Sequence, residues 1–92
     1  MKYKIFLTRE AEQQLLIWKK TGQKKELMKI FSLFKELEEH PKSGTGQIEK
    51  LRGNLVGYWS RRINKQHRII YSVQDDIVTV NVISVRGHYG EK

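Results

Sequence analysis

The sequence contains no cysteine, a single proline and no long apolar run. Without cysteine, neither disulfides nor thiolate metal sites can contribute to the fold, which suits a reducing compartment. The longest apolar runs, such as residues 15–18, are far shorter than the roughly 20 residues that a membrane-spanning helix needs. The N-terminus leads into a mixed segment instead of a signal peptide. We therefore expect a cytoplasmic protein without a membrane partner.

Several chemistry-bearing motifs are also missing. The three histidines, His40, His67 and His88, follow no recognised metal-ligand spacing, and the adjacent acids at 75–76 look like a hairpin turn. Residues 44–46 (Gly-Thr-Gly) have neither the spacing nor the following Lys-Ser/Thr of a phosphate-binding loop. The sequence therefore predicts no metal site and no cofactor.

What the chain does have is an excess of positive charge in its centre. Lysine and arginine number 18 against 10 acids, a formal net charge of +8. Residues 43–71 hold six basic side chains and one acid, Glu49, whereas residues 72–92 are slightly acidic. In residues 1–42 basic and acidic residues are mixed, as on an ordinary solvated helix surface. The central stretch therefore predicts a polyanionic partner.

The N-terminal half predicts one strand and two helices. Residues 2–7 have the composition of a short strand, Thr8 suits a helix N-cap, and Gly22 ends the first helix. His40-Pro41 ends the second helix, because proline disfavours helix at the residue before it. The second helix carries an apolar stripe at helical spacing, formed by Leu27, Ile30, Phe31, Phe34 and Leu37.

In the C-terminal half the apolar period changes to two. A loop over 41–47 leads to predicted strands at 55–63, 67–73 and 77–85, which are joined by short polar turns. Three such strands form an antiparallel meander. The whole chain, 1–92, is therefore predicted to be one α+β domain, an antiparallel sheet with the two N-terminal helices packed on one face.

Two adjacent arginines in the first of these strands must differ in environment. Alternation places Ser60 and Arg62 on one face of the strand and Trp59 and Arg61 on the other. One face must meet the helices, so both arginines cannot lie on the open side of a regular strand. The pattern alone does not decide which of them faces out.

The residue types for RNA cleavage without a metal are present. The ribose 2′-OH must lose a proton, the leaving 5′-oxygen must gain one, and the phosphorane needs fixed positive charge. A carboxylate or histidine can be the base, a histidine the acid, and arginine the cation that binds phosphate oxygens. Glu49, Arg68 and His88 supply these types.

Each of these residues also has an ordinary structural explanation. Glu49 suits a surface carboxylate that balances basic neighbours, and His88 with Tyr89 suits a frayed C-terminal tail. The strand arginines suit solvated positions that discourage edge pairing. Spacing alone does not bring the three groups to one place, so both explanations remain open at this level.

Three segments carry a resemblance to a known family. Residues 48–63 (Ile-Glu-Lys-Leu-Arg-Gly-Asn-Leu-Val-Gly-Tyr-Trp-Ser-Arg-Arg-Ile), 67–71 (His-Arg-Ile-Ile-Tyr) and 86–89 (Arg-Gly-His-Tyr) strongly resemble the YoeB/Txe family of the RelE superfamily. The match is dense over 48–73 and at the tail, and only architectural over the helices. The resemblance implies a RelE-like fold and a ribosome-dependent endoribonuclease, an mRNA interferase toxin that cleaves mRNA in the ribosomal A site.

The resemblance also implies roles for individual residues. Glu49 would be the general base, His88 the general acid, Arg68 the cation on the scissile phosphate, and Tyr89 a residue that orients the substrate. The basic stretch and the resemblance together predict an RNA-binding set consisting of Arg52, Arg61, Arg62, Lys65 and His67. Lys50 stands where relatives often carry proline, and residues 90–92 extend beyond the point where many relatives end.

The partners that the resemblance implies are a cognate antitoxin of the YefM/Axe type, mRNA and the 70S ribosome, and a second copy of the chain. Two alternatives belong to other classes: a non-catalytic RNA- or ribosome-binding module, and an inactive protein that only pairs with an antitoxin-like partner. A carboxylate within a basic surface favours the enzyme, because a pure RNA binder has no need of it.

Overall fold

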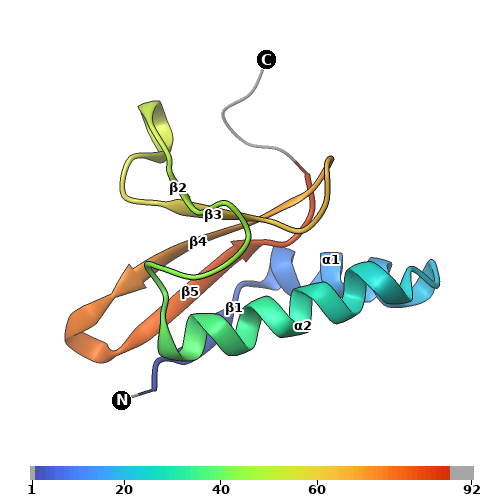
Figure 1. Cartoon of the computed structure of the whole chain (residues 1–92), viewed down its shortest axis with the longest axis horizontal. Coiled ribbons are helices and arrows are strands. Elements are labelled where there is room, and N and C mark those ends of the chain that lie inside the picture. The colour runs from blue at the N-terminus through green and yellow to red at the C-terminus, as the bar shows by residue number, and fades with distance from the viewer. Residues whose placement is uncertain (1, 88–92) are drawn as a thin grey trace.

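The computed structural model describes residues 2–87. The elements in chain order are β1 (Lys4–Leu7), α1 (Arg9–Lys20), α2 (Lys24–Glu39), β2 (Glu49–Lys50), β3 (Trp59–Arg62), β4 (Arg68–Gln74) and β5 (Thr79–Ser84). Short 3₁₀ turns precede β3 and β5, at Gly53–Leu55 and Asp75–Ile77. Figure 1 shows both helices on the same side of the sheet.

The five strands form one mixed sheet in the order β1-β5-β4-β3-β2. The predicted meander is confirmed, since β3 pairs with β4 and β4 with β5, both antiparallel. β1, however, runs parallel to β5, so the expectation of a wholly antiparallel sheet needs correction. The chain reaches the opposite edge of the sheet through α1 and α2 before it forms β2. The predicted α+β class is confirmed.

The start of α1 follows the sequence closely. Thr8 caps the helix: its hydroxyl accepts a hydrogen bond from the amide of Ala11 at 3.2 Å. Gly22 takes a φ of +70° in the short turn to α2, a conformation that costs glycine little. His40 ends α2 directly before Pro41, as predicted.

The apolar stripe of α2 is rotated from the predicted one. Ile30, Leu33 and Leu37 are fully buried, whereas Phe31 is 43% exposed. The buried positions 30, 33 and 37 fit helical spacing just as well as the predicted stripe does. Periodicity therefore could not decide which of the two sets is buried. The choice comes from packing against α1 and the sheet. In the described part of the chain, neither helix has the length and apolar character needed to span a membrane.

The strand edges also differ from prediction. The predicted strand 55–63 begins only at Trp59, because residues 53–55 form a 3₁₀ turn and Gly57 has a φ of +95°. β2 was not predicted at all. It contains two residues, too few to produce a periodic signal, yet it places Glu49 beside the basic strand β3.

Candidate active site

The strand register gathers several of the predicted residues on the open face of the sheet. Glu49 is paired with Ser60, and Arg62 with Arg68. Directly paired residues project to the same face, with Cβ atoms about 5 Å apart. The side chain of Arg61 is buried on the helix side, so its neighbours Ser60 and Arg62 project to the other side. The open face therefore carries a carboxylate and two guanidinium groups.

Arg68 is joined directly to the residue opposite the carboxylate. It is the first residue of β4, and its Nη1 donates a hydrogen bond to Ser60 Oγ at 3.2 Å. Ser60 is in turn the partner of Glu49 in the strand pairing. The predicted base and the predicted phosphate cation thus flank one serine. Sequence reasoning did not single out Ser60, because its place between the two residues depends on the pairing of β2 with β3.

The last described residue, Gly87, lies at the start of β4. Its amide donates to His67 Nδ1 at 2.8 Å, and its carbonyl accepts from the amide of Arg68 at 3.1 Å. The chain that leaves β5 is therefore held beside Arg68. His88 and Tyr89 lie outside the described residues, and their predicted roles stay predictions.

His67 has contacts within the fold that its predicted RNA-binding role did not anticipate. Its ring packs edge-on against Trp18, with centroids 5.0 Å apart, and its Nδ1 accepts the hydrogen bond from Gly87. Nδ1 is therefore engaged by the protein. Any contact of His67 with RNA would have to involve another part of the ring.

A basic cleft lies where β3 ends beside the start of α2. It has a volume of about 590 Å³. Four of the eight residues that line it are cations; the lining consists of Lys25, Glu26, Met28, Lys29, Arg62, Ile63, Asn64 and Lys65. The one acid, Glu26, accepts a hydrogen bond from Asn64 at 3.5 Å. Two predicted RNA-binding residues, Arg62 and Lys65, thus share one positive cleft, while Arg52 is exposed ahead of the 3₁₀ turn.

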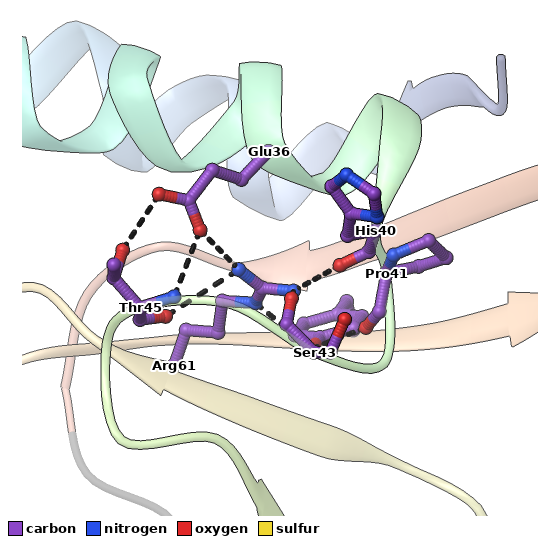
Figure 2. Close-up of polar contacts among 7 residues, drawn as sticks. Glu36, His40, Pro41, Ser43, Thr45 and Arg61 are labelled. Carbon is purple, nitrogen blue, oxygen red and sulfur yellow. Dashed lines mark hydrogen bonds and ion pairs between the residues drawn. The ribbon is translucent and has the colours of Figure 1, made fainter.

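Arg61 does not belong to this surface. Its side chain is fully buried, and Figure 2 shows its guanidinium between Glu36 of α2 and the loop that follows α2. Nη1 pairs with Glu36 Oε1 at 2.9 Å, and Nη2 donates to the carbonyl of Ser43 at 2.7 Å. Further bonds go to the carbonyl of His40 and to the hydroxyl of Tyr71. The prediction that Arg61 binds RNA is therefore wrong: alternation directs it inward, where it is saturated with acceptors.

Glu36 compensates the buried charge of Arg61 and ties down the same loop. Its carboxylate accepts from the amide and the hydroxyl of Thr45 at 2.9 and 2.7 Å. Partial burial raises the pKa of Glu36, but the hydrogen bonds from Thr45 and the nearby Arg61 outweigh this and hold the pKa below its usual value. The carboxylate therefore stays ionised at neutral pH. No local pattern indicates this pair, because its members are 25 residues apart.

The close approach of this loop predicts a steric effect at Gly44. Its φ is +122°, and an added Cβ would lie 2.5 Å from Glu36 Oε1 and 3.1 Å from Arg61 Nη1. We expect Gly44→Ala to lower the free energy of unfolding by about 1–3 kcal/mol from backbone strain, plus the cost of disturbing the ion pair. The measurement is urea denaturation.

Gly22→Ala is the matched control. Gly22 also has a positive φ, +70°, but nothing lies within 4 Å of the position that an added Cβ would take. Its replacement should cost only the left-handed backbone penalty of about 1–2 kcal/mol. Equal losses for the two variants would contradict the steric argument.

Metal coordination has no obvious place in the described part of the chain. Residues 2–87 contain no group of three or more histidine, aspartate or glutamate side chains placed to hold a metal ion. The chemistry that the described site offers is that of one exposed carboxylate and two partly buried guanidinium groups, while Ser60 is fully buried beneath them and accepts a hydrogen bond from Arg68.

Solved structures share this architecture. The "YoeB/ParE toxin from Agrobacterium tumefaciens" superposes with a TM-score of 0.86 at 34% identity, covering 94% of this chain and 99% of that chain. YoeB in the YoeB–YefM heterotetramer from Staphylococcus aureus gives 0.80 at 33% identity, covering 97% and 100%. RelE of the archaeal RelE–RelB complex from Pyrococcus horikoshii shares the fold, with a TM-score of 0.76 at 18% identity. These matches show that the chain has a RelE-like fold.

The sequence comparisons identify the family within that class. Residues 7–89 match the model of the "YoeB-like toxin of bacterial type II toxin-antitoxin system". Toxin YoeB from Synechocystis is 43% identical over 74 residues, which cover 79% of this chain and 83% of that protein. The chain belongs to the YoeB-like toxin family, as its central and C-terminal motifs predicted.

Proposed function

We propose that this protein is an mRNA interferase, an endoribonuclease toxin that cleaves mRNA in the ribosomal A site and thereby inhibits translation. The observation that carries the proposal is the placement of Glu49 and Arg68 on either side of Ser60, on the open face of a basic sheet. A carboxylate and a guanidinium on neighbouring strands suit acid/base cleavage of a phosphodiester, and membership of the YoeB-like family supports the same function.

In the proposed mechanism, the carboxylate of Glu49 removes the proton from the ribose 2′-OH. The 2′-oxygen forms a bond to phosphorus while the bond to the 5′-oxygen breaks, and Arg68 stabilises the added negative charge on the phosphorane. His88 gives a proton to the leaving 5′-oxygen, and Tyr89 orients the substrate. The products are a 2′,3′-cyclic phosphate and a 5′-hydroxyl, and the step needs no metal ion.

The described chain ends one residue before His88. Gly87 is held by the amide of Arg68 and by His67 Nδ1, so this end of the described chain lies beside the proposed phosphate cation. This supports an acid delivered from the C-terminal residues, on the side of Arg68. The proposal assigns His67 to holding this part of the chain and leaves the RNA contacts chiefly to Arg52, Arg62 and Lys65.

The basic cleft predicts a measurable salt dependence. If Arg62 and Lys65 each bind a phosphate, replacing both with alanine should make the negative slope of log K against log salt less steep, by about 0.7 per lost contact for single-stranded RNA. Fluorescence anisotropy with a labelled RNA oligonucleotide over a range of salt concentrations measures the slope. The control is Lys19→Ala/Lys20→Ala at the exposed end of α1, which should leave the slope unchanged. Identical slopes in parent and cleft variant would contradict the assignment.

The proposed protein partners follow from the relatives. The S. aureus relative has been solved as a "YoeB dimer" and as a YoeB–YefM toxin–antitoxin complex. We infer a cognate antitoxin of the YefM/Axe type and a homodimer for this chain. An acidic antitoxin segment that folds onto the basic open face would exclude RNA by occupying the same charges.

The alternative function is a non-catalytic RNA- or ribosome-binding module. Primer extension on mRNA from a purified translation system, with and without the protein, separates the two. Discrete breaks at A-site codons are the expected result for the interferase. Translational arrest with intact transcripts would overturn it and favour the binding module.

A further inference from the structure

We propose that Arg61 is a positioning residue for Glu49. Its buried guanidinium holds the loop 40–46 and thereby fixes the face of the sheet on which β2 presents the carboxylate. The inference rests on the proposed function, because it concerns the placement of the proposed base.

The strand that carries Glu49 cannot fix its own register. β2 has two residues, both exposed, and it lies at the edge of the sheet. A shift of one residue along β3 would turn every side chain to the opposite face. In the observed register Glu49 faces Ser60 on the open side, so a slip would place Lys50 there instead. The register must therefore come from the segments that flank β2.

The C-terminal flank provides one backbone attachment: the amide of Leu51 donates to the carbonyl of Tyr58 at 2.9 Å. The N-terminal flank is held more extensively. The amide of Arg62 donates to the carbonyl of Gly46 at 2.5 Å, directly before the segment that enters β2. Arg61 holds the residues just upstream, through the carbonyls of Ser43 and Thr45 at 2.7 and 3.4 Å.

Arg61 is itself fixed from both layers of the protein. Glu36 on α2 pairs with Nη1, and Tyr71 in the core of β4 accepts from Nε at 3.2 Å. Figure 2 shows the guanidinium surrounded by the loop and the end of α2. A single planar group thus connects the end of α2, the loop and the sheet. Lysine could not replace it, because one ammonium group cannot reach acceptors spread around the guanidinium plane.

The loop follows Arg61 closely along its path. A Cβ added at Gly46 would lie 3.3 Å from Arg61 Cβ and 3.5 Å from the amide nitrogen of Arg62. Gly46 has a φ of +93°, which favours glycine. The position of Gly46 is therefore set by direct contact with β3, and only residues 47 and 48 separate it from Glu49.

A double-mutant cycle tests whether Arg61 acts through Glu49. The variants are Arg61→Lys, Glu49→Gln and the combination, each confirmed as folded by circular dichroism, and the readout is the single-turnover rate of mRNA cleavage on saturating ribosomes. Arg61→Lys should slow cleavage by about tenfold to a hundredfold when Glu49 is present. In the Glu49→Gln background it should change the rate by less than about twofold, because the group it positions is gone. In an Arg62→Ala background, which keeps Glu49, Arg61→Lys should slow cleavage by the same factor as in the parent protein.

Equal losses from Arg61→Lys in both Glu49 backgrounds would overturn the proposal and leave Arg61 a purely structural residue. If Arg61→Lys does not fold, Thr45→Val replaces it in the same cycle. This variant removes the hydrogen bond from the Thr45 hydroxyl to Glu36, which holds the same loop. A parent-like rate for Glu49→Gln alone would instead refute the proposed base.

Amide hydrogen exchange at Leu51 provides a readout that needs no RNA. If Arg61 fixes the register of β2, Arg61→Lys should reduce the protection of this amide while the amides of β4 and β5 stay protected. Unchanged protection of Leu51 would overturn the proposal, even if the parent protein proved inactive on RNA.

Discussion

Replacing Glu49 with glutamine is expected to slow mRNA cleavage by about 10² to 10⁴, with little change in affinity for RNA or ribosomes. Glutamine keeps the size and hydrogen-bonding ability of the side chain but cannot remove a proton from the 2′-OH. Glu49 is exposed on a two-residue edge strand, so the substitution removes no core packing. Single-turnover cleavage in a reconstituted translation system measures the rate, and ribosome pelleting measures the binding.

Glu12→Gln provides a matched control, because Glu12 is an exposed glutamate in the first turn of α1, remote in sequence from the site. This variant should cleave at the parent rate. The proposed base would be refuted if the Glu49 variant also cleaved at that rate. A large increase in KM with an unchanged kcat would instead give Glu49 a role in substrate binding.

The second large effect concerns stability. Arg61→Met is expected to lower the free energy of unfolding by about 2–4 kcal/mol, because it leaves several acceptors around a fully buried position without a donor and removes the partner of Glu36, which is itself 30% exposed. The substitution removes the Arg61 donor from Glu36, from the hydroxyl of Tyr71 and from three loop carbonyls, those of His40, Ser43 and Thr45. For a domain of this size, each kcal/mol corresponds to about 4–8 °C in Tm. Urea and thermal denaturation measure the loss.

The neighbouring Arg62→Met tests the specificity of this effect. Arg62 lies on the open face, one residue along the same strand, and is only partly buried. Its replacement should change the free energy of unfolding by about 0.5 kcal/mol or less, as for an ordinary surface substitution. Similar losses for the two arginine variants would show that the Arg61 network adds little to stability.

Some of the site could be predicted from the sequence because the chemistry resides in the residue types. Glu49 is the one acid in the basic stretch, and Arg68 begins a clearly periodic strand. Those features, with the family motifs, were enough to select both residues. They could not show that Ser60 lies between them, because that relation depends on the pairing of β2 with β3.

The difference between Arg61 and Arg62 shows most directly what long-range contacts add. The two residues are adjacent, identical in type and equal in local propensity. Alternation required that they point to opposite faces, but the direction of each depended on where α2 and the loop after it are placed. The acceptors of Arg61 come from residues 36–45 and from Tyr71, which are far from it in the sequence.

Short-range periodicity and capping were sufficient to predict the α+β class, the Thr8 cap, the ends of both helices and the antiparallel meander. They could not predict the parallel pairing of β1 with β5, the rotation of the α2 stripe or the existence of β2, which became visible only in the folded chain. The burial of Arg61 belongs to the same group. All of these features depend on contacts between residues that are distant in the chain. Local sequence patterns carry no information about the energies of such contacts.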